Sequence, residues 1–128
     1  MRKAVGEFDV KIAPVSGADE VLNRLSIDKQ YHGDLVGTGV GQMMASRDEK
    51  AKTGVYVAIE TVTGMLKGRK GSFILAHRGL MSPAGQELSV VITPASGTGE
   101  LADISGDLEI ILEGGKHSYV LRYTLPAN

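Results

Sequence analysis

Apolar and polar residues alternate along most of the chain, which is the pattern of half-buried β-strands. Phe8, Val10 and Ile12 alternate with charged neighbours, and later stretches are rich in β-branched and aromatic residues. The pattern predicts eight strands, at residues 4–13, 22–32, 35–46, 54–66, 71–80, 87–93, 105–113 and 116–125. Between them we predict a polar connection at 16–21, a charged loop at 47–53 and at most one short helical turn, near 98–103.

Eight antiparallel strands with almost no helix need closure, because open sheet edges promote aggregation. Eight strands close into a barrel whose interior holds side chains or one small ligand. We therefore predict an all-β fold with one domain, residues 1–128, as a closed eight-stranded antiparallel β-barrel in which the first strand pairs with the last. Gly37, Gly39 and Gly41 leave one face of their strand without side chains, which permits sharp bending or the close approach of a large group.

The last hairpin can be registered from its turn. Gly114 and Gly115 suit the central positions of a type I′ turn. This register sorts apolar residues onto one face and two opposite-charge pairs onto the other, and a one-residue slip would destroy the sorting. The expected pairs are Gly106–Tyr123, Leu108–Leu121, Ile110–Tyr119 and Leu112–His117 inside, with Asp107–Arg122 and Glu113–Lys116 outside.

The central hairpin brings candidate chemistry into the interior. With Gly68 and Arg69 at the centre of a type II′ turn, Glu60 faces His77 directly. Their Cβ atoms are then expected about 4.5–5.5 Å apart. The same face carries Val62, Phe73 and Leu75.

The second hairpin is registered less firmly. With Gly33 and Asp34 as its turn, Leu25 faces Gln42 and Ile27 faces Val40. This interpretation places Gln42, and with it Met44, in the barrel interior on a face that is otherwise apolar except for Lys29.

Composition narrows the function classes. The chain has 128 residues, of which 14 are basic and 15 acidic, so it lacks the basic excess of a nucleic-acid-binding domain. Cysteine is absent, which excludes disulfides, thiolate metal sites and a cysteine nucleophile. No stretch resembles a membrane span or the apolar run of a signal peptide, so we expect a cytoplasmic protein without membrane or nucleic-acid partners.

No motif indicates a metal or a cofactor. His32, His77 and His117 lack the spacing of metal ligands. The glycines at 37–41 resemble a dinucleotide-binding loop only superficially, because a strand pattern follows them where that loop needs a helix. We therefore expect neither a metal nor a cofactor.

Glu60 and His77 are the candidate catalytic residues. A buried carboxylate and imidazole must be hydrogen-bonded in any case, so the pair could be purely structural. Alternatively, such pairs mark sites that contact ligand or move protons. Gln42 would be a hydrogen-bonding neighbour. The walls of a ligand site would be Tyr56, Phe73, Tyr119 and Tyr123, although inward-facing aromatic residues more often belong to a core.

Three blocks, at residues 32–37, 56–79 and 96–106, resemble the bacterial domain-of-unknown-function family 3224, and the resemblance covers nearly the whole chain. It implies an allene oxide cyclase-like barrel, a calycin-like or lipocalin-like shape shared with dirigent proteins, and a homodimer or homotrimer. It implies no activity. Plant allene oxide cyclases hold a reactive fatty-acid epoxide inside the barrel, but their catalytic residues match no positions here.

Three functions are compatible with this sequence. The preferred one is binding of a small apolar or amphipathic molecule in the barrel lumen. The second is a cofactor-free isomerase or cyclase in which Glu60 or His77 moves a proton. The third is a structural or interaction barrel whose own side chains fill the interior.

Overall fold

The structure, a computed structural model, describes residues 1–15 and 23–126. Eight of its strands match the eight predicted ones to within two residues at each end, and there is one further strand, β7, of two residues. The predicted connection at 16–21 and residue 22 lie outside the described residues. The strands are β1 (Arg2–Pro14), β2 (Asn23–Gly33), β3 (Leu35–Asp48), β4 (Thr53–Leu66), β5 (Arg69–Ser82), β6 (Gly85–Ile92), β7 (Thr98–Gly99), β8 (Ser105–Glu113) and β9 (Lys116–Thr124).

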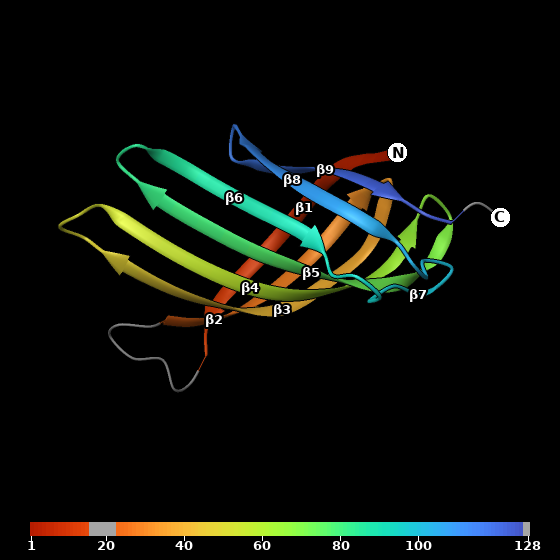
Figure 1. The fold of residues 1–128 in the computed structure, drawn as a ribbon, viewed down its shortest axis with the longest axis horizontal. Helices are drawn as coiled ribbons and strands as arrows, with labels where there is room; N and C mark the ends of the chain where they lie inside the picture. The colour runs from red at the N-terminus through yellow and green to blue at the C-terminus, as the bar shows by residue number, and fades with distance from the viewer. Residues whose placement is uncertain (16–22, 127–128) are drawn as a thin grey trace.

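The sheet closes on itself, as predicted. Going round the ring, the strands are β1, β2, β3, β4, β5, β6, β8 and β9, and β9 pairs with β1. The first–last pairing runs from Arg2 opposite Tyr123 to Phe8 opposite His117. β7 pairs with β5 outside the ring. The chain is therefore a closed eight-stranded antiparallel barrel with one extra strand (Figure 1).

The last hairpin has the predicted register, including Ile110 opposite Tyr119 and Asp107 opposite Arg122. Gly114 and Gly115 both have positive φ, as a type I′ turn requires. On the outer face, Arg122 lies 3.0 Å from a carboxylate oxygen of Glu109 and 4.0 Å from one of Asp107.

The predicted register of the central hairpin is wrong by two residues. The turn lies at Lys67 and Gly68, which both have positive φ, so it belongs to type I′ and not to type II′. Glu60 therefore lies opposite Leu75, and His77 lies opposite Ala58. A shift of two residues keeps every side chain on its face, so Glu60 and His77 still share the interior.

The predicted register of the second hairpin is wrong by one residue. Only Asp34 separates the two strands, and both its backbone N–H and its carboxylate hydrogen-bond to Val5 of β1. Ser26 consequently lies opposite Gln42, and both face outward. Gln42 and Met44 are exposed on the outer face, so the expectation that they enter the interior is corrected.

The segment after β6 contains turns and no helix. Leu101 and Ile104 each donate a backbone hydrogen bond to the residue three positions earlier. These turns bring both side chains, each 1% exposed, into the core. Across the described ranges, no helix is long and apolar enough to cross a bilayer.

One half of the barrel is filled by its own side chains. The connection from β6 to β8 lies at this end, on the side of β7 (Figure 1), and contributes Leu101 and Ile104 to the core. We call it the filled half. Its main side chains are Leu35, Leu66, Phe73, Leu75, Leu101, Ile104, Leu121 and Tyr123.

The other half keeps inward-facing apolar side chains in contact with solvent. Ile12 is 53%, Leu88 47% and Leu112 64% exposed, although each lies on the same inward face of its strand as buried residues do. The β3–β4 and β5–β6 hairpins extend beyond the core at this end (Figure 1). We call it the open half. Its inward-facing residues are Ile12, Leu25, Met43, Tyr56, Met81, Leu88, Ile110 and Leu112.

The contrast between the halves predicts a difference in stability effects. Leu101→Ala should lower the free energy of unfolding by about 2–5 kcal/mol, because it leaves a cavity in the filled half. The matched change Leu112→Ala should cost about 0.5 kcal/mol or less, since the side chain is already solvated. Urea denaturation of both variants measures the difference, and similar losses would contradict the division into two halves.

Candidate functional site

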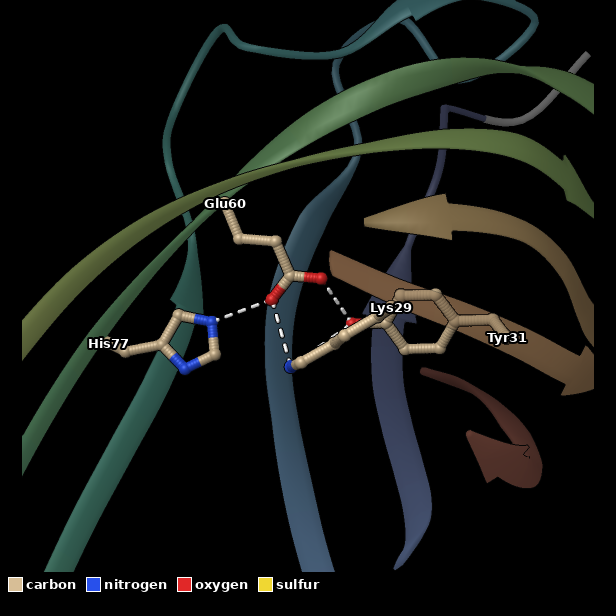
Figure 2. Close-up of polar contacts among 4 residues, drawn as sticks. All are labelled: Lys29, Tyr31, Glu60 and His77. Carbon is tan, nitrogen blue, oxygen red and sulfur yellow. Dashed lines mark hydrogen bonds and ion pairs between the residues drawn. The ribbon is translucent and has the colours of Figure 1, made fainter. Parts of the chain in front are cut away.

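A buried polar cluster surrounds the carboxylate of Glu60, which is 0% exposed. One oxygen, Oε1, lies 2.9 Å from Nε2 of His77 and accepts a hydrogen bond from Nζ of Lys29 at 3.0 Å. The other, Oε2, accepts a hydrogen bond of 2.5 Å from the hydroxyl of Tyr31. Figure 2 shows the three groups converging on the carboxylate. We call Lys29, Tyr31, Glu60 and His77 the Glu60 cluster.

Strand alternation and a glycine bring the cluster together. Lys29 and Tyr31 share the inward face of β2 with Ile27, while Glu60 and His77 come from β4 and β5. A Cβ atom at Gly39 would collide with Oε2 of Glu60 and the ring of Tyr31. The strand face without side chains thus lets a carboxylate and an aromatic ring approach β3 closely, as the glycine pattern predicted.

Lys29 is buried without being isolated. Its ammonium lies 3.0 Å from the Glu60 carboxylate and 4.8 Å from the centre of the Phe8 ring. The Tyr31 ring centre is 5.7 Å away. A cation over aromatic faces gains electrostatic attraction in addition to its ion pair. The ammonium is therefore held at this position by one carboxylate and two rings.

The cluster keeps Glu60 ionised. Burial alone would raise the pKa of Glu60, but the hydrogen bond from His77, the charge of Lys29 and the hydrogen bonds from Tyr31 and Lys29 outweigh it and lower that pKa. Burial and the neighbouring Glu60 charge raise the pKa of Tyr31, so its hydroxyl stays protonated and donates.

His77 has one ring nitrogen left over. Nε2 interacts with Glu60, and the described residues give Nδ1 no hydrogen-bond partner. Every fully buried side-chain nitrogen or oxygen in those residues has a partner, so Nδ1 retains a small exposed area on a side chain that is only 4% exposed. In Figure 2 this nitrogen points away from Glu60. Among the described residues, Nδ1 of His77 is therefore a ring nitrogen of the cluster that no protein group uses.

The predicted wall residues fall into different regions. Phe73, Tyr119 and Tyr123 are buried in the core. The Tyr119 hydroxyl accepts a hydrogen bond from the Leu35 N–H and donates one to the backbone oxygen of His32. Tyr56 is half-buried in the open half, where its ring packs over Gly79.

Gln42 lies outside the barrel, 3.5 Å from the Arg24 guanidinium, so it is not a neighbour of the cluster. Sequence reasoning did not single out Lys29 and Tyr31. The alternation in the sequence could have identified them, because both lie on the same face of a predicted strand as Ile27, which points inward.

A cleft opens between β6 and β8. Only Val91 and Asp107 pair across these strands, and beside them lies a hollow of about 390 Å³. Its inner lining consists of Leu88, Val90, Leu108 and Ile110. Val90 lies directly opposite His77 on β5, so the cleft adjoins the cluster.

A larger hollow, of about 1070 Å³, lies between the β3–β4 and β5–β6 hairpins. Charged residues line part of it, including Arg47, Glu49 and Lys50, and Met81 connects it with the open half. Neither hollow is lined by Glu60 or His77 themselves. The cluster thus lies beneath the accessible space, with His77 next to Val90 of the cleft wall.

Comparison with known families decides the classification. The sequence profile described as "Protein of unknown function (DUF3224)" matches residues 4–123. The chain belongs to the DUF3224 family. A similar solved structure, a crystal structure at 1.84 Å resolution, is that of a DUF3224 protein with unknown function from Shewanella oneidensis MR-1. It is 34% identical, covers 100% of this chain and 99% of its own, and superposes with a TM-score of 0.93.

No protein with a curated function matches the chain. Membership of DUF3224 therefore establishes the barrel and assigns no activity, so any function must be argued from the Glu60 cluster and the open half.

The cluster predicts how one substitution affects stability. Glu60→Gln should lower the free energy of unfolding at pH 7 by about 3–5 kcal/mol, because it leaves the buried Lys29 without a counter-charge. The folded state lowers the pKa of Glu60, so its stabilising contribution is present above the ordinary value of 4.5 and is lost as pH falls through the lower, folded value. The gap between wild type and variant should therefore narrow below pH 4.5.

Denaturation curves from pH 7 down to pH 3 measure this gap. Glu109→Gln is the matched control, since Glu109 forms an exposed pair with Arg122 and its loss should cost about 1 kcal/mol or less. Equal effects of the two substitutions, or a gap that widens in acid, would contradict the role of the cluster.

Proposed function

We propose that this DUF3224 barrel binds a small apolar or amphipathic molecule in its open half. The observation that supports this most strongly is the exposure of inward-facing apolar side chains at one end of a barrel whose other end is filled. Contiguous exposed apolar surface rimmed by polar residues is typical of ligand-binding grooves.

The dimensions agree with a small ligand. The cleft between β6 and β8 has a volume of about 390 Å³, and ligand sites commonly measure about 300–1,000 Å³. Its inner wall is aliphatic, and its outer edge carries Asp107, Glu109 and Arg122. The apolar part of a ligand would lie against the aliphatic wall. Its polar end could contact protein polar groups at the outer edge of the cleft or at the Glu60 cluster.

Cofactor-free isomerisation is the second candidate, favoured by the environment of His77. An ionised carboxylate interacts with one ring nitrogen while the other nitrogen is accessible. This arrangement orients an imidazole for proton transfer. Glu60 orients His77 here, and His77 would remove and return a proton of the bound molecule.

Binding is tested with N-phenyl-1-naphthylamine, a neutral apolar fluorophore. We expect saturable binding to the wild type. Leu88→Asp should weaken it at least about tenfold, because a charge would be placed in the apolar cleft. Ile59→Asp, at an outer-face residue that is 65% exposed, should change the dissociation constant less than about twofold.

Two results would contradict the binding proposal. Absence of saturable binding would favour a structural barrel, and equal losses in Leu88→Asp and Ile59→Asp would place the fluorophore outside the open half.

Isomerisation is tested by proton exchange. In D₂O the wild type should accelerate deuterium incorporation next to the carbonyl of 2-decanone, followed by NMR. His77→Leu should lower the rate of deuterium incorporation about a hundredfold or more, because a positioned base typically contributes an acceleration of that size. His32→Leu changes an exposed histidine and should have no effect. Equal exchange rates with wild type and His77→Leu would exclude His77 as the base.

A further inference from the structure

We infer that the open half selects a ligand with a hydroxyl end, and that Nδ1 of His77 accepts the hydrogen bond from that hydroxyl. This inference rests on the proposed binding function and specifies the polar chemistry of the ligand. It follows from which hydrogen-bonding groups the Glu60 cluster uses internally and which it leaves free.

The carboxylate of Glu60 determines which ring nitrogen of His77 has the proton. Oε1 is an acceptor without a hydrogen, so Nε2 at 2.9 Å must donate. In a neutral imidazole the other nitrogen is then an acceptor. Lys29 already donates to the same oxygen at 3.0 Å, so a protonated His77 would place a second cation on it. His77 therefore offers a lone pair at Nδ1.

The donors of the cluster are directed inward. The Tyr31 hydroxyl donates to Oε2 of Glu60, and burial beside Glu60 keeps it protonated. The Lys29 ammonium donates to Glu60 and lies 3.5 Å from the Tyr31 hydroxyl, with the centres of the Phe8 and Tyr31 rings 4.8 and 5.7 Å away. A ligand that only accepts hydrogen bonds, such as an ester, would have to compete with Glu60 for these donors.

An anionic ligand is disfavoured by charge. Glu60 and Lys29 form a 3.0 Å ion pair and cancel each other, so the cluster has no unpaired cation to attract a carboxylate. Among the groups around His77, Val90 on β6 and Ala58 on β4 contribute no charge. The hydroxyl is thus the polar end that best complements one accessible acceptor in an apolar setting.

Three probes with chains of similar length test the inference at pH 8: 1-decanol, methyl nonanoate and decanoate. Each is titrated as a competitor of N-phenyl-1-naphthylamine. In the wild type, 1-decanol should bind more tightly than the ester. His77→Leu should reduce the alcohol-to-ester affinity ratio by about twofold to tenfold, which corresponds to one hydrogen bond. His32→Leu, on the outer face, should leave this ratio unchanged.

The outcomes separate this inference from the binding proposal. Binding of all three probes with a ratio that His77→Leu does not alter would overturn the hydroxyl assignment and leave the binding function standing. Tighter binding of decanoate would overturn it in favour of an anion site. Failure of every probe and of the fluorophore would overturn both proposals.

A second measurement does not depend on the variant folding. ¹⁵N NMR of the wild-type histidines at pH 8 should show His77 with a protonated Nε2 and an unprotonated Nδ1, and the Nδ1 signal should shift when 1-decanol binds. A proton on Nδ1 with none on Nε2, or no shift at saturation, would contradict the inference.

Discussion

The interior of this barrel depends on one buried carboxylate. Glu60 lies where solvent does not reach it, so its charge must be stabilised by the protein. Two strands supply the donors, β2 through Lys29 and Tyr31 and β5 through His77. The cluster also requires a glycine in β3, because the carboxylate and the Tyr31 ring occupy the space where a side chain of residue 39 would lie. Four neighbouring strands are thus adapted to a single side chain.

The same cluster separates two environments. On one side, the interior is packed with Leu, Ile, Phe and Tyr side chains and closed by the turns that contain Leu101 and Ile104. On the other side, the strands diverge, β6 and β8 keep a single ladder pair, and apolar side chains face solvent. A polar floor beneath an apolar opening suits an amphipathic ligand. The proposed binding function would give the barrel a reason to retain an ion pair that apolar residues could replace.

Much of this fold could be predicted from the sequence, because period-two alternation and turn chemistry are local. The register of the last hairpin followed from Gly114 and Gly115. The register of the central hairpin differed from the prediction by two residues, because Lys67 adopts a positive φ that lysine does not favour.

The register of the second hairpin differed from the prediction by one residue, because Asp34 hydrogen-bonds to Val5, a contact that only closure of the barrel creates. The two-residue shift of the central hairpin left Glu60 and His77 facing the interior. The one-residue shift of the second hairpin placed Gln42 on the outer face. Lys29 was placed on the inward face but not assigned to the site, because a lysine on a strand is normally solvated.

A double-mutant cycle between Lys29 and Glu60 tests most directly whether the buried carboxylate organises the interior. The free energies of unfolding of the wild type, Lys29→Met, Glu60→Gln and the double variant would be measured in urea at pH 7. The account predicts a coupling of about 1–3 kcal/mol, with the double variant less destabilised than the sum of the single ones, since removing both charges leaves neither unpaired. Additivity within about 0.5 kcal/mol would contradict it.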